Sequence, residues 1–363
     1  MRWRFVQICL LTLVTAVATD LVLGQIGKLV VPTWRSELQE SAARPAHPVF
    51  HHGLAPRAAF ESQFGSTRTS YFTNSLGFRD GSTRDVPLRS DKYRVLLMGD
   101  SMTEGLGVPY EDSFAGKIGA AVGGQNIEIL NGGLISYSGS LYYRKTKYYI
   151  EDVGLHVNSV VVFIDISDME DEALCYRMGD DGTIYSLCPR KISFARRAKA
   201  FLKLNSAYYR FYRAVKDGLS ESSRRRRLGP IGSVTNLNRA RWTFDDDLYQ
   251  RIGAPGLEKN KLYLDKLQAF LKERGIPLTV AVYPWPDQIL ARDLDSKQVT
   301  FWRAWAEERG AGFVNLFPTF INERDPVAVI TDDFIPYDVH FNEAGHQLVA
   351  REFLRQYRMR PGP

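Results

Sequence analysis

From Tyr93 onward the sequence alternates short apolar segments with longer segments of helical periodicity, and this alternation limits the fold more than any other feature. The apolar segments are Tyr93–Met98, Ile127–Asn131, Ser159–Ile164, Pro277–Tyr283 and Gly312–Leu316. The helical segments are Ser113–Val122, Leu141–Val153, Lys259–Arg274, Gln298–Glu308 and Glu343–Tyr357. Continuous apolar strands separated by helices are typical of a parallel sheet that is covered on both faces. The sequence therefore predicts a doubly wound α/β domain with a five-stranded parallel sheet.

The size and composition of the chain agree with such a domain. The chain has 363 residues, 44% of them hydrophobic and 24% charged, which excludes a disordered, collagen-like or disulfide-scaffold protein. The length allows two domains, but one α/β domain with an insertion explains the pattern as well, and we prefer it. We predict a signal anchor at residues 1–24, a turn-rich lead-in at 25–89 and the α/β domain at 90–363, with an insertion at 172–256.

The N-terminus has the features of an export signal. Arg2 and Arg4 precede the largely apolar run Phe5–Leu23, an arrangement that holds the N-terminus in the cytoplasm. The segment Ala16–Ala18 matches a cleavage site, whereas the run as a whole approaches the length of a membrane-spanning helix. We favour an uncleaved anchor over a cleaved signal. Both alternatives place the rest of the chain outside the cytoplasm, in the periplasm or at the cell surface.

The insertion carries most of the positive charge. The chain has a net charge of +6, but Arg190–Arg227 alone holds 13 basic and two acidic residues. We predict a basic amphipathic helix at Ile192–Val215 and an exposed polar loop at Ser220–Arg227. The segment is either a solvated helix and loop, which we favour, or a cap that contacts an anionic polymer or a membrane surface. Nucleic acid is a poor partner for an exported chain.

The cysteines leave one question open. Cys175 and Cys188 flank a short loop and are able to pair in an oxidising compartment, but their spacing does not decide whether they do. The sequence has none of the cysteine and histidine spacings typical of zinc sites.

Two segments carry residues suited to nucleophilic catalysis. The first apolar segment ends in Gly99-Asp100-Ser101, and in a parallel sheet ligands bind at the carboxyl ends of the strands. A serine there can also simply cap the next helix. Near the C-terminus, Asp338 and His340 share one segment, and a hydroxyl nucleophile needs such a base and such a carboxylate. His346, six residues later, is expected to pack within the last helix.

These two segments resemble the motifs of the SGNH/GDSL hydrolase family, over about Tyr93 to Tyr357. The resemblance implies a flavodoxin-like fold in which Ser101 attacks an acyl ester, His340 is the general base and Asp338 orients it. In that family the oxyanion hole combines the amide of the serine, a glycine amide after the second strand and an asparagine side chain after the third strand. Here Gly133 or Ser136 fills the second role, and Ser167 stands at the asparagine position.

The spacing of Asp338 and His340 limits the class of substrate that we expect. Asp-x-His is similar to the motif of alginate O-acetyltransferase-type members of the superfamily, which serve exported polysaccharide. The resemblance implies an extracytoplasmic serine esterase that acts on acyl esters of carbohydrate, with acetyl as the expected group. Alternatives are an O-acetyltransferase of a surface polysaccharide and a non-catalytic polysaccharide-binding protein of the envelope.

We expect no cofactor and no metal, and the sequence does not determine the oligomeric state. A rival interpretation treats an acidic run as a divalent-metal site, since hard cations favour carboxylates. We prefer to assign this run to the start of a helix, where its dipole stabilises negative charge. The run comprises Asp165, Asp168, Glu170, Asp171 and Glu172.

Overall fold

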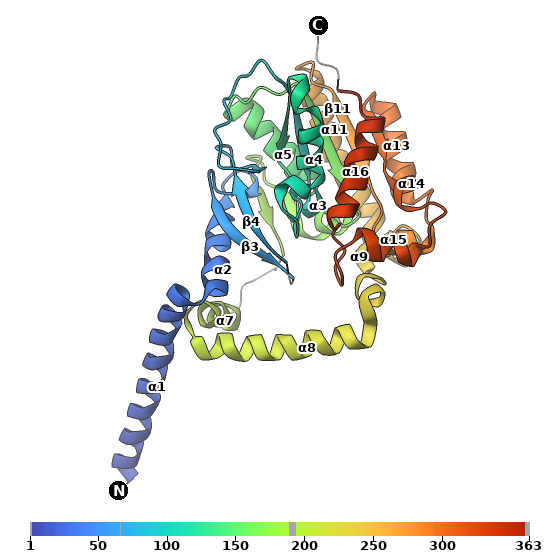
Figure 1. Cartoon of the computed structure of the whole chain (residues 1–363). Coiled ribbons are helices and arrows are strands. Elements are labelled where there is room, and N and C mark those ends of the chain that lie inside the picture. Colours follow the sequence, from blue (N-terminus) through green and yellow to red (C-terminus); the bar gives the residue numbers. More distant parts are fainter. Residues whose placement is uncertain (1, 66, 189–193, 360–363) are drawn as a thin grey trace.

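The computed structural model describes residues 2–65, 67–188 and 194–359, and its main feature is an eight-stranded sheet (Figure 1). The strand order is β12-β11-β8-β6-β7-β5-β4-β3. Five strands are those predicted: β6 (Tyr93–Gly99), β7 (Ile127–Asn131), β8 (Ser159–Ile164), β11 (Leu278–Val282) and β12 (Gly312–Asn315).

The five predicted strands are parallel and lie in the flavodoxin-like order. With β6 counted as the first strand, the order of these five across the sheet is 2-1-3-4-5. The strands are mostly apolar because helices cover both faces, and Val95 to Met98 are fully buried. Arg94 of β6 and Glu128 of β7 are buried exceptions that form an ion pair with each other. The predicted fold class is therefore confirmed.

The helices between these strands also follow the prediction, with small shifts at their ends. On one face α4 packs against α16, and on the other α5 packs against α11, while α13 packs against β11 and β12 (Figure 1). The predicted helix Leu141–Val153 is α5 followed by a π-helical turn, Tyr148–Asp152. The bounds are α4 (Phe114–Val122), α5 (Gly139–Lys147), α11 (Ala254–Lys272), α13 (Lys297–Arg309) and α16 (Glu343–Gln356).

The predicted number of strands is wrong, because the lead-in adds three antiparallel strands to the sheet. These are β3 (Ala59–Phe64), β4 (Thr67–Thr73) and β5 (Arg79–Asp80), and β5 pairs with the end of β7. In β3 and β4 buried and exposed residues alternate, so neither strand has the continuous apolar run that marks the parallel strands. The lead-in is thus part of the sheet and not only a turn-rich approach to it.

The insertion also differs from the prediction. In place of one helix and a loop there are two helices, α7 (Phe194–Asn205) and α8 (Ala207–Val234), and Ser206 caps the second by accepting a hydrogen bond from Tyr209 N. The segment Ser220–Arg227, predicted as a loop, is helical. Part of the predicted helix, Ile192 and Ser193, lies outside the described residues. Helix α8 continues past Val215 because residues 216–228 contain neither proline nor a repeated glycine.

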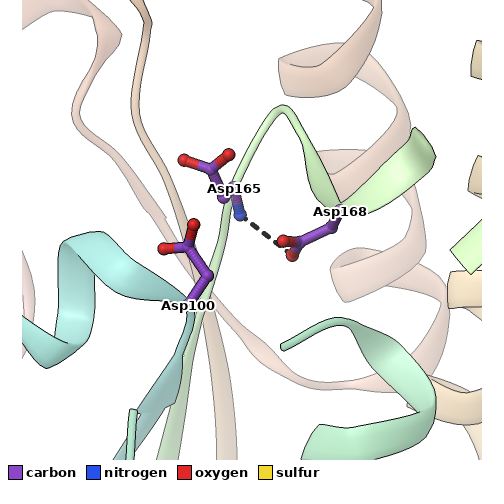
Figure 2. Close-up of side chains that lie close together, drawn as sticks. All are labelled: Asp100, Asp165 and Asp168. Atoms are coloured by element: carbon purple, nitrogen blue, oxygen red, sulfur yellow. Dashed lines mark hydrogen bonds between the residues drawn. The ribbon is translucent and has the colours of Figure 1, made fainter. Parts of the chain in front are cut away.

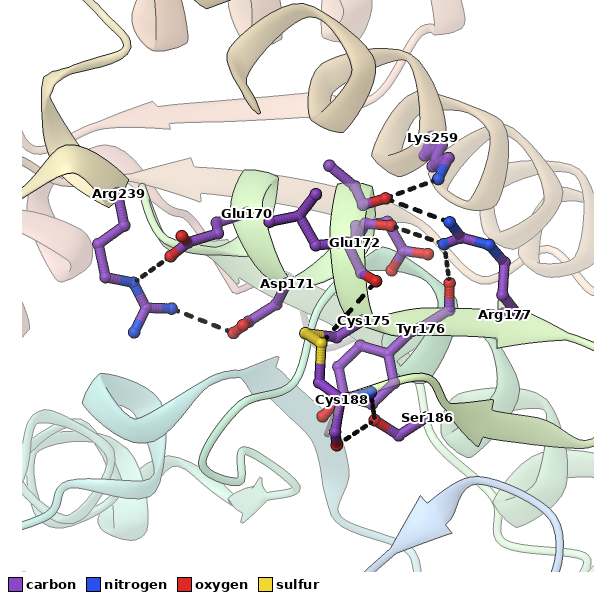
Figure 3. Close-up of a disulfide and its surroundings, with 12 residues drawn as sticks. Glu170, Asp171, Glu172, Cys175, Tyr176, Arg177, Ser186, Cys188, Arg239 and Lys259 are labelled. Atoms are coloured by element: carbon purple, nitrogen blue, oxygen red, sulfur yellow. Dashed lines mark hydrogen bonds and ion pairs between the residues drawn. A yellow bond between two sulfur atoms is a disulfide. The ribbon is translucent and has the colours of Figure 1, made fainter. Parts of the chain in front are cut away.

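The question of the cysteines is settled by a disulfide between Cys175 and Cys188 (Figure 3). The bridge closes a small hairpin of β9 (Tyr176–Met178) and β10 (Ile184–Ser186) at the start of the insertion. Arg239 pairs with Glu170 and Asp171 and so binds the second half of the insertion to the segment that directly precedes it (Figure 3).

Helix α1 (Arg2–Val30) extends away from the rest of the molecule (Figure 1). It is the one helix among the described residues that is long and apolar enough to cross a membrane, and a signal sequence would have the same properties. It continues beyond residue 24, where we placed the end of the anchor, and is followed directly by α2 (Pro32–Ala43).

The remaining elements are short and lie at the ends of the sheet or in the insertion. They are β1 (Ala46–His47), β2 (His51–His52), α3 (Ser101–Glu104), α6 (Asp168–Glu170), α9 (Asn238–Arg241), α10 (Asp246–Leu248), α12 (Pro286–Ala291), α14 (Phe317–Phe320) and α15 (Pro326–Asp333).

Candidate active site

Ser101 begins α3 directly after β6, at the carboxyl end of a strand in the middle of the sheet. The strand neighbours of β6 are β7 and β8, whose connections run in opposite directions, and such a switch point is where ligands bind in open α/β sheets. Asp100 caps α3 by accepting a hydrogen bond from Met102 N at 2.9 Å. The alternative that Ser101 itself is the cap is therefore wrong, and its hydroxyl instead lies within hydrogen-bond distance of Asp100 Oδ2, at 3.1 Å.

His340 and Asp338 lie on the loop before α16, and the structure brings both to Ser101. The Nε2 atom of His340 lies 2.8 Å from Ser101 Oγ, and its Nδ1 atom lies 2.5 Å from Asp338 Oδ1. The loop is fixed by its own backbone, since Ile335 N donates to His340 O and Asp338 N donates to Ile335 O. Serine, histidine and aspartate thus form one hydrogen-bonded chain, as in catalytic triads.

The electrostatics of this chain suit a general base. Burial by itself would lower the pKa of His340, but the hydrogen bond and charge of Asp338 outweigh it and raise that pKa above its usual value of 6.5. Burial raises the pKa of Asp338, and the hydrogen bond with His340 more than offsets this, so that the net shift is downward. Asp338 therefore stays ionised and supports the imidazolium form of its partner.

A second group of carboxylates lies directly beside the serine. Asp100, Asp165 and Asp168 are fully buried or nearly so, and an oxygen of each lies within 4.8 Å of the others (Figure 2). Burial, followed by the charge of Asp165, raises the pKa of Asp100 to about 7. Burial and the charges of Asp100 and Asp165 raise the pKa of Asp168 well above its usual value. Because like charges this close disfavour joint ionisation, the protonated forms of Asp100 and Asp168 are favoured.

These three carboxylates form the arrangement in which a hard cation could bind, but hydrogen bonds from the protein already engage each of them. Asp165 accepts from Trp285 Nε1 and Ser167 N, and Asp168 accepts from Tyr142 Oη and Asp165 N. The raised pKa values of Asp100 and Asp168 also favour a proton over a metal. The other members of the acidic run point elsewhere: Glu170 and Asp171 pair with Arg239, and Glu172 accepts from Ser138 and Ser140.

Of the residues predicted for the oxyanion hole, Gly133 is less suited to that role. Its amide donates to Asn131 Oδ1 at 3.1 Å, so it is already used. A Cβ atom at this position would lie 2.7 Å from the side chain of Thr103, which shows that Gly133 is needed for close packing against α3. This hydrogen bond makes Gly133 the less favoured of the two predicted amide donors, Gly133 and Ser136.

The other oxyanion candidates remain compatible with the geometry. Ser136 is exposed and has a left-handed backbone, with φ of 60°. Ser167 is 4% exposed, and its hydroxyl has no hydrogen-bond partner among the described residues. Ser167 follows β8, which pairs with β6 in a register that sets Gly99 beside Phe163. The end of β8 thus lies next to Ser101, where a free hydroxyl donor is of use.

The lead-in also contributes to this site, although we did not predict this from the sequence. Phe64, at the end of β3, packs its edge against the His340 ring, with 5.0 Å between the centroids. Glu104, three residues after Ser101, accepts hydrogen bonds from Arg44 at 2.6 Å and from Tyr71 Oη at 2.5 Å. Glu104 was the signal in the sequence from which this contribution could have been found. A carboxylate beside a buried strand requires a hydrogen-bond or ion-pair partner.

His346 and the aromatic residues after β11 have structural roles. His346 is 1% exposed and accepts a hydrogen bond from Phe114 N, as the expected packing role requires. Tyr283 and Trp285 are buried. They donate to Asp100 and Asp165, respectively, and fix the carboxylates beside Ser101.

The topology and the positions of the two motifs give this chain the fold of the SGNH/GDSL hydrolases, as the sequence implied. No protein-family model matches the chain, and no curated protein matches it.

Solved structures with a similar fold include three proteins of low sequence identity. The α/β hydrolase LAE5, from the metagenome of Lake Arreo in Spain, is 14% identical, with 74% of this chain and 96% of that chain covered and a TM-score of 0.41. A lipolytic protein assigned to the G-D-S-L family, from Desulfitobacterium hafniense, is 12% identical, with 73% and 100% covered and a TM-score of 0.40. A catalytic mutant of Axe2, an acetylxylan esterase from Geobacillus stearothermophilus, is 14% identical, with 73% and 93% covered and a TM-score of 0.40.

Proposed function

We propose that the chain is a serine ester hydrolase that works through an acyl-enzyme. The observation that carries this proposal is the hydrogen-bonded chain from Ser101 through His340 to Asp338. A serine hydroxyl becomes a useful nucleophile only when a base accepts its proton, and an imidazole needs a carboxylate to fix its tautomer. All three requirements meet at the carboxyl end of β6.

In the first step Ser101 Oγ attacks the carbonyl carbon of the ester, and its proton moves to Nε2 of His340. The carbonyl oxygen becomes an oxyanion, for which Ser101 N and the Ser167 hydroxyl are the proposed donors. Collapse of this intermediate breaks the bond to the alcohol, which leaves with the proton from Nε2. Water then repeats the sequence on the acyl-serine and releases the acid.

We further propose that the substrate is an acetyl ester of carbohydrate outside the cytoplasm. The Asp-x-His spacing, which resembles that of alginate O-acetyltransferase-type proteins, supports this choice, as does α1 with its N-terminal arginines. Transfer of the acetyl group to a sugar hydroxyl would use the same three residues, with the sugar in place of water.

The test uses the full chain in detergent with p-nitrophenyl acetate. The parent should release p-nitrophenol and be labelled at Ser101 by a fluorophosphonate, and Ser101→Ala should do neither. His340→Gln should retain the hydroxyl but lose its activation. Equal rates for the parent and Ser101→Ala would overturn the proposed function.

A second arm divides hydrolysis from transfer. Acetate should appear without any sugar present if water is the acceptor. Acetylation of added oligosaccharide, with little release of free acetate, would replace the hydrolase by a transferase that uses the same residues.

A further inference from the structure

Helices α7 and α8 form a basic and aromatic surface that the proposed chemistry does not use. Residues 211–220 of α8 are exposed throughout, so the middle of this helix is not packed against the domain (Figure 1). From Phe194 to Val234 the two helices hold eleven basic and two acidic residues. An uncovered helix of this composition calls for a partner that carries negative charge.

The apolar residues of α8 lie on one face. Five large apolar or aromatic residues follow the spacing i, i+3, i+4, i+7 and i+11, which is a single stripe on a helix. All five are exposed: Tyr208 by 74%, Phe211 by 68%, Tyr212 by 46%, Val215 by 47% and Leu219 by 66%. We call this set the apolar stripe. In water such a stripe is unfavourable, because it leaves several large side chains exposed together.

The opposite face of α8 is polar and points to the catalytic domain. Arg210 pairs with Glu37 of α2 at 2.7 Å and stacks on the Trp34 ring at 4.3 Å. At the other end of the helix, Arg225 lies 4.6 Å over the ring of Tyr337, the residue before Asp338. Because polar residues near both ends of α8 contact the domain, the apolar stripe is directed away from the domain.

Helix α1 leaves the molecule at the start of α8. The carboxylate of Asp20 accepts a hydrogen bond from Tyr208 N at 2.7 Å, next to the first residue of α8. A Cβ atom on Gly24 would lie 1.8 Å from Asn205 O, so the helices touch backbone to backbone at this point. Exposed apolar residues occur on α1 both before and after Asp20, and in Figure 1 the N-terminal part of α1 extends beyond α8, with the domain on the other side of α8.

We propose that the apolar stripe lies in the interface of a bilayer with anionic lipids, into which α1 inserts. A helix with an apolar face and basic flanks binds in the plane of such an interface. Lys216 flanks the stripe, and Arg226 and Arg227 continue beyond it. Helix α8 also contacts the loop that carries Asp338. This arrangement therefore holds the part of the site that contains Ser101 and His340 toward the membrane surface. The proposal does not depend on the proposed function.

The experiment measures the depth of single nitroxide labels on the full chain in nanodiscs of phosphatidylcholine and phosphatidylglycerol. Cys9 is first changed to serine, so that only an introduced cysteine reacts, because Cys175 and Cys188 are bonded to each other. The test positions are Val215→Cys and Leu219→Cys on the apolar stripe. The matched control is Asp217→Cys, on the polar face between them, where only an exposed ion pair with Arg213 is lost.

We expect labels at 215 and 219 to collide more with oxygen, which enters the bilayer, than with a water-soluble nickel complex. The label at 217 should show the reverse order. Equal access of the nickel complex to all three positions would overturn the proposal. In discs of phosphatidylcholine alone the oxygen preference at 215 and 219 should decrease, and an unchanged preference would overturn the role of anionic headgroups.

A further measurement tests an anionic polymer as the alternative partner of the apolar stripe. If the labels at 215 and 219 are open to the nickel complex in nanodiscs and become protected only when polygalacturonate is added, the stripe binds an anionic polymer and the membrane proposal is wrong.

Discussion

The Nε2 atom of His340 lies 2.8 Å from the Oγ atom of Ser101, although 239 residues separate them in the chain. Two backbone features fix this contact. The cap of Asp100 on α3 holds the serine at the end of β6, and the hydrogen-bonded turn from Ile335 to His340 holds the imidazole.

Replacement of Asp338 by asparagine should lower kcat by about 10⁴-fold, because the imidazole loses the carboxylate that fixes its tautomer. The pH profile should change as well. The parent needs neutral His340, so its kcat/KM should rise with pH through a midpoint above 6.5. Without Asp338, burial dominates and the midpoint should fall. The profile on p-nitrophenyl acetate checks both effects, and an unchanged midpoint would contradict the assignment.

Replacement of Asp100 by asparagine should also lower the midpoint of the pH profile. The negative charge of Asp100 helps to raise the pKa of His340, and Asp100 itself titrates at about 7. Asparagine caps a helix as well as aspartate does, so α3 should remain intact. Circular dichroism and the melting temperature provide the control. A parent-like profile would show that the two titrations are independent.

Replacement of Ser167 by alanine should lower kcat by about 100-fold with little change in KM, since an oxyanion donor acts mainly in the transition state. The matched control is Ser136→Ala, which retains the backbone amide and should keep the parent kcat. A normal rate for Ser167→Ala would remove this hydroxyl from the oxyanion hole. A large loss for Ser136→Ala would instead assign a role to that side chain.

Replacement of Arg44 by methionine should lower the free energy of unfolding by about 3–5 kcal/mol, because it leaves the buried carboxylate of Glu104 without its cation. Arg57→Met is the matched control. The pair of Arg57 with Asp85 is exposed, and its loss should cost less than about 1 kcal/mol. Urea unfolding measures both variants, and similar small losses would show that Glu104 does not depend on this ion pair.

Removal of the disulfide should weaken the fold without abolishing the site. Cys175 and Cys188 are 13 residues apart, and a loop of this size is stabilised by about 3 kcal/mol when it is closed. The double variant Cys175→Ser, Cys188→Ser should lose this amount in denaturant unfolding. Cys9→Ser should lose nothing, because Cys9 is exposed on α1. A double variant as stable as the parent would contradict this role of the bond.

The sequence by itself determined the parallel sheet, because a strand buried on both faces is apolar along most of its length and helices must separate such strands. It also indicated Ser101, Asp338 and His340 as candidate catalytic residues, because they occur in short motifs that suit nucleophilic catalysis. It did not reveal β3, β4 and β5, whose half-exposed strands leave no continuous apolar run.

Only the tertiary structure decided how distant residues use their hydrogen bonds. It showed that the Gly133 amide is engaged by Asn131, that Trp285 is buried against Asp165, and that the ends of α8 are held at Arg210 and Arg225. The local sequence shows which chemical groups are present. Whether a side chain is buried, and which group it hydrogen-bonds, depends on chain segments that are far apart in the sequence. For that reason Ser101 could be proposed as the nucleophile from its motif. The surroundings that shift the pKa values of His340 and Asp100, and the direction in which the apolar stripe faces, could not be predicted.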